Sequence, residues 1–214
     1  MNVLKAGAMS ALLGTLLFGC EDRNPAAISE GTTGPDAGTG VSAKAGSLNA
    51  LMRWDIINAD FATGTASAGG VASAFANDNS KITLTGSGTF RSNPGKSQNV
   101  TGGGDWTTYA PGGSVTGSGS YKVTGFVSFV LATGTPPLPN DDIGPDARPG
   151  LAVLSISYSD GSDGVLIVSC HFVGTSDAVF EGITATKGYV DYWNREAPPA
   201  PPGNANRTAF HILK

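Results

Sequence analysis

The sequence predicts an all-β domain, an antiparallel barrel of about eight strands, with a β-sandwich as the alternative. Glycine accounts for 31 of the 214 residues and charged residues for only 14%, a composition typical of strands joined by tight turns. Apolar residues alternate with Ser and Thr over several segments, as they do in half-buried strands. Downstream of Cys20, no stretch has the apolar periodicity of a helix.

The first candidate strand covers residues 51–59, which include Trp54. Residues 71–76 and 81–91 flank the run Asn-Asp-Asn-Ser at 77–80. Because these are turn-forming residues between two apolar segments, the pattern predicts a hairpin. Along 81–91, large apolar side chains and glycines alternate with Thr and Ser, so one face should be buried and the other solvated.

The longest candidate strand covers residues 113–133, beyond the usual length of about 3–10 residues. Its apolar residues and several glycines share one parity, and Ser and Thr hold most of the other. That parity places Val123, Val127 and Phe129 in the core and Thr124 and Ser128 in solvent. Glycines on the inner parity indicate strong bending, which is typical of closed barrels.

The remaining strand candidates are bounded by Gly, Pro or Asp and cover 102–109, 151–159, 165–173, 182–193 and 208–213. Residues 135–150 form a polar loop with five prolines, and 196–206 form a second Pro-rich loop. The run from Val165 to Val173 is apolar on both parities, which predicts a central strand covered on both sides.

A short motif, Gly-Ser-Gly-Thr/Ser-aromatic, occurs at residues 86–90 and again at 117–121. Two copies indicate equivalent bends in two strands of one sheet and not a repeat architecture. With the long bent strand, this pattern resembles calycin-type and allene-oxide-cyclase-like eight-stranded barrels. The resemblance implies an architecture only, because no signature motif of either family is present.

The N-terminus has the organisation of an export signal: Lys5, an uncharged apolar run over 6–18, and charges from Glu21 onward. The run is shorter than the about 20 residues that a membrane-spanning helix needs. Its end, Leu17-Phe18-Gly19-Cys20, resembles the lipobox of bacterial lipoprotein precursors. That resemblance implies removal of residues 1–19, a diacylglyceryl thioether on Cys20, and a lipid-anchored position on the periplasmic or extracellular side of the cell envelope. An ordinary signal peptide with an incidental cysteine is the alternative.

Residues 20–47 after this signal lack large apolar side chains over most of their length and predict a flexible tether. The folded domain is expected over 48–214. The chain is acidic, with a net charge of −4, and it has no basic cluster that would bind nucleic acid or anionic lipid. Attachment to the membrane is therefore expected through Cys20 alone.

Metal and cofactor motifs are not apparent in the sequence. The two histidines, His171 and His211, and the one remaining cysteine, Cys170, are too few for a structural zinc site. Residues 102–104 (Gly-Gly-Gly) lack the Gly-Lys-Ser/Thr ending of a phosphate loop, and residues 160–164 have the composition of a turn. We therefore expect no metal and no cofactor. Cys170, within an apolar strand, is expected to be a small buried side chain.

The densest polar and aromatic stretch supplies the candidate ligand site: Lys187, Tyr189, Asp191 and Trp193 on one parity, with Glu181 and His171 nearby. At a barrel mouth such a face would bind a small ligand. On an outer face, the same residues would be a cross-strand ion pair with amphipathic aromatics.

Two functions remain open. The first is a binding or envelope-structural module whose partner is a small molecule, a glycan or an envelope protein. The second is an enzyme that acts on a small molecule through Glu181, His171 and Asp191, the acid–base groups nearest this stretch. Convergence of these three side chains on one cavity would favour the enzyme.

Replacing the lipobox cysteine tests the anchor. Cys20→Ala should move the protein from the membrane fraction to the soluble fraction and abolish acyl labelling, because lipid chains supply the membrane affinity. Cys170→Ala is the matched control and should stay with the membrane. Sedimentation of Cys20→Ala with membranes after a high-salt wash would contradict the lipoprotein prediction.

Overall fold

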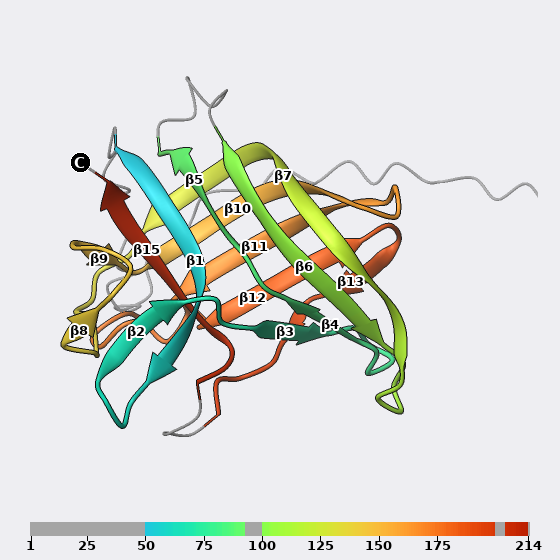
Figure 1. The fold of residues 1–214 in the computed structure, drawn as a ribbon, viewed down its shortest axis with the longest axis horizontal. Coiled ribbons are helices and arrows are strands. Elements are labelled where there is room, and N and C mark those ends of the chain that lie inside the picture. The colour runs from blue at the N-terminus through green and yellow to red at the C-terminus, as the bar shows by residue number, and fades with distance from the viewer. Residues whose placement is uncertain (1–49, 93–99, 200–203, 214) are drawn as a thin grey trace, which may run out of the picture. The chain divides into compact units, whose positions relative to one another are not determined.

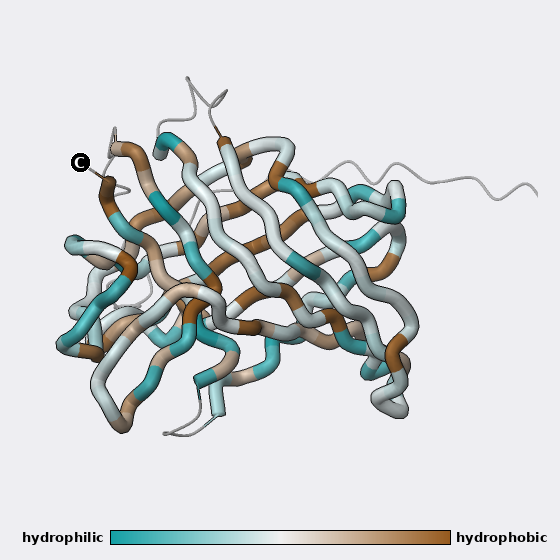
Figure 2. The backbone as a smooth tube through the Cα atoms, viewed as in Figure 1, coloured by the Kyte–Doolittle hydropathy of each residue, from teal (hydrophilic) through white to brown (hydrophobic). Residues whose placement is uncertain are grey.

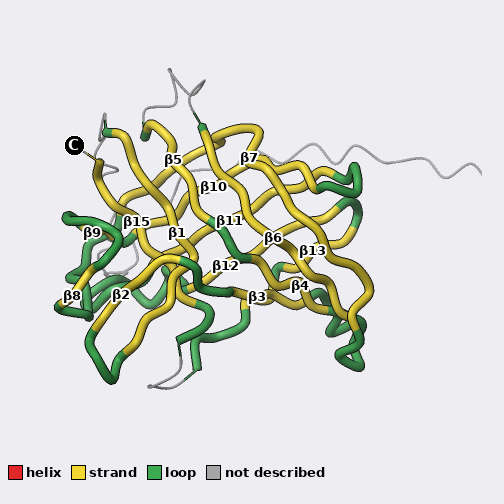
Figure 3. Tube along the Cα trace, in the orientation of Figure 1, coloured by secondary structure: helices red, strands yellow, loops and turns green. Residues whose placement is uncertain are grey.

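The computed structural model describes residues 50–92, 100–199 and 204–213. These residues form fifteen β-strands and no helix, so the all-β prediction is confirmed. The strands and their connecting loops are distinguished in Figure 3. No helix in these ranges could span a bilayer. The expected signal segment, Cys20 and the tether lie outside the described residues.

Ten strands form the main path of one sheet, in the order β13-β12-β11-β10-β7-β6-β5-β1-β15-β9 (Figure 1). They are β1 (Leu51–Asp60), β5 (Ser87–Arg91), β6 (Thr101–Tyr109), β7 (Val115–Leu131), β9 (Ala147–Arg148), β10 (Gly150–Tyr158), β11 (Asp163–Cys170), β12 (Gly182–Lys187), β13 (Val190–Tyr192) and β15 (Arg207–Leu213).

Five short strands lie off this path: β2 (Thr65–Ala68), β3 (Ala72–Phe75), β4 (Lys81–Leu84), β8 (Asn140–Asp141) and β14 (Asn194–Arg195). β14 pairs with β3, β3 with β4, and β4 with β6. β2 pairs with β1 and also with β8, the latter through a parallel ladder, which makes the sheet mixed.

The sheet folds back on itself without closing into a barrel. In Figure 1, β1, β5 and β6 form a front layer that runs across β10, β11 and β12 behind it. Among the described strands, no ladder joins β11 or β12 to β15, although a side-chain bond from Thr208 to the Ser169 carbonyl, 2.6 Å long, brings β15 beside β11. The predicted closed barrel is therefore not confirmed, and an open, sandwich-like sheet describes the fold better. Bent strands allow a sheet to fold back on itself, but a closed barrel also needs hydrogen-bonded pairing between its first and last strands.

The predicted single strand over 81–91 is divided into β4 and β5 at Gly86. Both strands pair with β6 on one side, but on the other side β4 pairs with β3 and β5 pairs with β1. Gly86 has a φ of +143°, and a Cβ there would lie 2.3 Å from the Tyr121 hydroxyl. Only glycine fits this position, because a side chain would meet both backbone strain and Tyr121.

The long strand β7 carries bulges that the alternating pattern did not reveal, one in its pairing with β6 and two in its pairing with β10. Its pairing with β10 skips Thr124 and Val127. Each extra residue reverses the parity that follows it. Consequently Val123 and Phe129 contact the core as predicted, whereas Val127, 54% exposed, does not, so its predicted inward position is wrong. Phe126 contacts the core instead. Among the residues predicted to face solvent, Thr124 is exposed and Ser128 is half-buried.

Glycines on the inner parity of β7 leave room for an aromatic side chain. A Cβ at Gly117 or Gly119 would lie about 3 Å from the indole of Trp106, which is buried on β6. The indole Nε1–H also donates to the Ser120 carbonyl at 3.1 Å. These glycines are therefore required by packing as well as by bending.

Side chains fill the space between the two layers. Phe90 stacks on Phe126 with ring centroids 4.9 Å apart, and Phe129 contacts Phe210 at 5.0 Å. Trp54 is fully buried beside them, and Cys170 is a free, buried thiol, as expected from its apolar strand. Figure 2 shows apolar residues recurring along β10, β11 and β12, the strands that form the rear layer.

The Pro-rich loop over 135–150, which contains β8 and β9, packs with β2 on the outer face of β1 and β15. A second apolar cluster forms there from Ile57, Ala59, Ala66 and Ala209, against which Phe61, Leu138 and Ile143 pack. Asp141 holds the loop in place, since it accepts the Ile143 N–H at 3.0 Å and pairs with His211 Nε2 at 2.8 Å. The segment predicted as a polar loop thus has an apolar side that covers the sheet.

Truncating Phe126 tests the positions of the bulges. Phe126→Ala should lower the free energy of unfolding by about 2–4 kcal/mol, because it removes an aromatic side chain that packs on the core. Val127→Thr, one residue away on the exposed face, should stay within about 0.5 kcal/mol. Denaturant unfolding measures both, and the reverse ranking would contradict the observed register.

Candidate functional site

The carboxylate of Glu181 bridges the gap where the sheet stays open. Glu181 lies immediately before β12, and its Oε2 accepts the backbone N–H of His171 at 2.5 Å, just after β11. Its Oε1 accepts the backbone N–H of Thr208 on β15 at 2.7 Å. The side chain therefore satisfies two N–H groups that have no partner strand, as an edge ladder would do.

Burial raises the pKa of Glu181 to about 8, against the opposing effects of the two N–H groups and of Arg207 and Arg195. At neutral pH the protonated, uncharged form is therefore favoured. Although Glu181 is mostly enclosed, part of it lines a cleft between the sheet and the Pro-rich loop.

This cleft is narrow and has a volume of about 450 Å³ when the open space at its mouth is included. Its walls are mostly apolar: Ile57, Ala59, Phe61, Ala66 and Ala209 on the sheet side, and Pro136, Pro137 and Leu138 on the loop side. Four ionisable residues also line it: Asp141, His171, Glu181 and Arg207. A mostly apolar cleft with a few polar groups is typical of small-molecule sites.

Arg207 is the cation of the cleft. Its guanidinium carbon lies 4.5 Å from the centroid of the Phe61 ring, a cation–π contact. Nε is buried and has no hydrogen-bond partner among the described residues. Burial lowers the pKa of Arg207, but a guanidinium remains charged at neutral pH. No ion pair is formed by Arg207 within the described ranges.

The other ionisable groups of the cleft are already engaged. Asp141 pairs with His211, and the Nδ1 of His171 lies 2.8 Å from the Val179 carbonyl. Arg207 is thus the one Arg or Lys of the lining, and it forms no ion pair in the described structure. A buried donor without an acceptor costs about 1–3 kcal/mol, and a ligand with an anionic oxygen would supply the acceptor.

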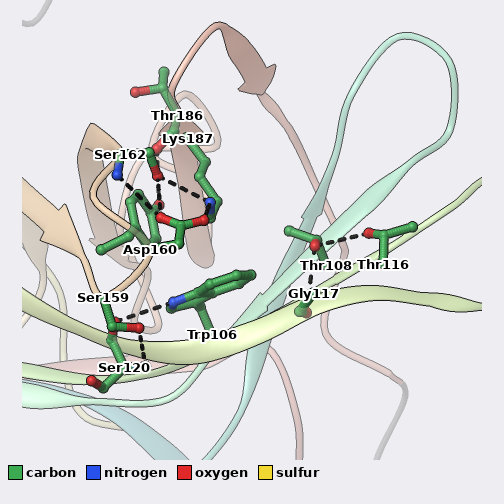
Figure 4. Close-up of polar contacts among 11 residues, drawn as sticks. Trp106, Thr108, Thr116, Gly117, Ser120, Ser159, Asp160, Ser162, Thr186 and Lys187 are labelled. Carbon is green, nitrogen blue, oxygen red and sulfur yellow. Dashed lines mark hydrogen bonds and ion pairs between the residues drawn. The ribbon is translucent and has the colours of Figure 1, made fainter.

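Lys187 lies in a different part of the molecule, where its charge is fully used (Figure 4). Nζ forms an ion pair with Asp160, donates to Ser162 Oγ at 3.0 Å, and lies over the ring of Trp106 at 4.2 Å. Lys187 lowers the pKa of Asp160 to about 2. These contacts join the β10–β11 turn to β12, and they describe a structural cluster.

Tyr189, Asp191 and Trp193 lie in a third place, beside the β3–β4 turn, where they line a shallow depression. The predicted strand over 182–193 is a hairpin, with Gly188 and Tyr189 in the turn between β12 and β13. The turn removes the common parity expected for Lys187 and Trp193. The six candidate residues therefore do not form one site. Glu181 and His171 line the cleft, and Tyr189, Asp191 and Trp193 line the depression. Lys187 contacts neither group and belongs to the structural cluster with Asp160.

Arg207 and Phe61 belong to the cleft but were not singled out from the sequence. One sequence signal was present: Leu138 and Ile143 are apolar residues in an otherwise polar loop, and such residues indicate a loop that packs on something. Within the described ranges, no group of three or more His, Cys, Asp or Glu side chains is placed to hold a metal ion.

Comparisons with known proteins add no family to this description. No protein-family model, no curated protein and no solved structure matches the chain.

Replacing the carboxyl group of Glu181 with an amide tests its role at the gap. Glu181→Gln should destabilise the fold by about 1–3 kcal/mol, because the amide nitrogen cannot accept the second N–H. The pH dependence should also change. The folded pKa of about 8 is above the ordinary 4.5, so this contribution is complete below about pH 4.5 and is lost as the pH rises towards 8.

Denaturant unfolding at several pH values measures both effects. The stability of the native protein relative to Glu181→Gln should decline between about pH 5 and 8, with a limiting slope of about 1.4 kcal/mol per pH unit. Glu196→Gln is the control, because Glu196 is only partly buried and contacts Ser73 through its backbone N–H, which the substitution keeps. Identical pH profiles for the native protein and Glu181→Gln would contradict a protonated Glu181.

Proposed function

We propose that this protein is a lipid-anchored binding module of the bacterial cell envelope, and that its cleft holds a small ligand with an apolar body and an anionic group. The observation that carries the proposal is Arg207, a guanidinium that lines an apolar cleft without an ion pair and with a buried Nε–H that has no acceptor. Ligand pockets commonly combine apolar walls with one oriented charge of this kind.

The apolar walls and the Arg207 guanidinium would each contact a different part of the ligand. Pro136, Pro137 and Leu138 face Ile57 and Ala209 across the cleft. A ligand that covers these apolar side chains removes them from contact with water, which favours binding. A carboxylate is the best complement for Arg207, since guanidinium and carboxylate groups form paired, charge-assisted hydrogen bonds. The narrowness of the cleft favours a ligand of few heavy atoms.

The place of action is proposed from the N-terminal sequence. A lipid on Cys20 would hold the protein at the envelope, and residues 20–47 would give the domain a reach of roughly 25–30 Å from the membrane. An acidic chain of net charge −4 supports neither nucleic acid nor anionic lipid as a partner. The ligand would be a small molecule that diffuses in the envelope.

Binding is better supported than catalysis. An enzyme using Glu181, His171 and Asp191 would need the three groups at one cavity. Glu181 and His171 line the cleft, but Asp191 lies at the depression. Both oxygens of Glu181 also accept backbone N–H groups, so the carboxylate is occupied in holding the sheet together.

Calorimetric titration with hexanoate and hexanol tests the proposal. The native protein should bind hexanoate more tightly than hexanol, and Arg207→Gln should weaken hexanoate binding by about tenfold or more, because a charge-assisted pair is lost. Arg207→Lys should retain part of the affinity. Arg91→Gln, an exposed residue of β5, is the matched control and should bind as the native protein does.

The pH dependence gives an independent check. Hexanoate affinity should fall as the pH rises through about 8, where Glu181 becomes charged beside Arg207 and His171. In Glu181→Gln this fall should be absent. Absence of binding by either probe, or hexanoate binding that Arg207→Gln does not weaken, would contradict the proposal.

A further inference from the structure

A second concave site lies where the β12–β13 hairpin meets the β3–β4 turn. It is a shallow depression of about 570 Å³, including the open space above it, and it shares no lining residue with the cleft. Tyr189, Asp191 and Trp193 come from the hairpin and the residues after it, and Asn77 and Asp78 come from the turn. Its composition differs from that of the cleft, because it combines aromatic and acidic side chains.

Two aromatic side chains are unusually exposed at this depression. Tyr189 is 100% exposed and Trp193 is 56% exposed, whereas Trp54 and Trp106, the other two tryptophans, are buried. Tyr189 occupies a two-residue turn with Gly188, whose φ of +57° allows β12 and β13 to pair directly up to this turn. The backbone under Tyr189 is therefore fixed by the hairpin, and the ring is presented to solvent. Large exposed aromatic side chains commonly mark binding sites.

The charge of the depression has one sign. Asp78 and Asp191 line it, and neither forms an ion pair in the described structure. Hydrogen bonds from the hydroxyl and backbone N–H of Ser80 lower the pKa of Asp78 and fix the position of its carboxylate, with the backbone N–H 2.9 Å from Oδ1. No Lys or Arg lines the depression.

The cationic side chains of the neighbouring strands contact other groups. Lys187 is paired with Asp160, Lys81 lies over the rings of Phe75 and Tyr109, and Arg195 lies over the Phe180 ring. The lining of the depression therefore supplies no cation to balance Asp78 and Asp191.

We propose that this depression binds a small quaternary ammonium compound, with its methylated nitrogen against Trp193 and Tyr189 and its charge balanced by Asp78 and Asp191. Aromatic faces beside carboxylates are the usual means of recognising such cations. A primary ammonium group would need three acceptors to replace its strong hydration. A quaternary nitrogen has no N–H donor, so aromatic faces and nearby negative charge are sufficient.

The size of the depression favours a free small molecule over a protein partner. Seven residues line it, whereas a stable protein interface uses about 20–30 residues on each side. The site is shallow and open to water, so each cation–π contact is weak, and dissociation constants in the millimolar range are expected.

Titration with choline, followed by NMR at the Trp193 indole N–H, tests the proposal. The peak is assigned by its loss in Trp193→Phe. Choline should shift it saturably, and 3,3-dimethyl-1-butanol, which has the same shape without the charge, should bind at least about tenfold more weakly. Asp191→Asn and Asp78→Asn should each weaken choline binding several-fold. Asp177→Asn, at an exposed residue that does not line the depression, should not.

The same spectra exclude the other occupants. The substituted side chains are exposed, so each variant is expected to fold. The remaining peaks of each spectrum report whether it does. Equal binding of choline and its neutral analogue, a saturable shift with cellobiose but not with choline, or choline binding unchanged in both Asn variants would overturn the proposal, as would the absence of a saturable shift. Arg207→Gln should leave choline binding unchanged, since the two sites are independent.

Discussion

The two hydrogen bonds of the Glu181 carboxylate hold together the part of the fold where the backbone ladder stops. One oxygen accepts an N–H at the end of β11 and the other accepts an N–H on β15. Ordinary strand pairing satisfies such groups without a side chain. Here one carboxyl does so from a buried position, and burial raises its pKa to about 8. The junction between β11 and β15 and the polarity of the cleft beside it therefore depend on this residue.

Both concave sites lie where strand pairing is interrupted. The cleft lies beside the Glu181 bridge and is covered by the Pro-rich loop, and the depression lies where the β12–β13 hairpin approaches β3 and β4. Elsewhere the interior is filled, since Trp54 and the four clustered phenylalanines occupy the space between the layers. Because side chains fill the interior, a ligand can bind only where strand pairing is interrupted at the edges of the sheet, as in other packed β-folds.

The sites differ in the sign of the charge that they leave uncompensated. In the cleft it is the guanidinium of Arg207, held against Phe61. In the depression it is the pair Asp78 and Asp191 beside exposed aromatic rings. Lys187 shows the contrast. Its charge is balanced by the ion pair with Asp160, and Nζ also lies over the Trp106 ring (Figure 4). This cluster also combines aromatic and charged side chains, but its role is structural. The availability of a charge, and not the residue type, separates the sites from the scaffold.

The sequence by itself determined the all-β class, most of the strands and hairpins, and the burial of Cys170, because alternation and turn residues act over short distances. It did not determine the bulges that expose Val127 and bury Phe126, since both residues are apolar and one extra residue leaves the composition unchanged. Nor did it determine the open sheet or the cleft. Glu181 meets Thr208, and Phe61 meets Arg207, only after distant strands are packed. Those contacts were decided by the tertiary structure, because the partner of a buried polar group is fixed by long-range packing and not by its neighbours in sequence.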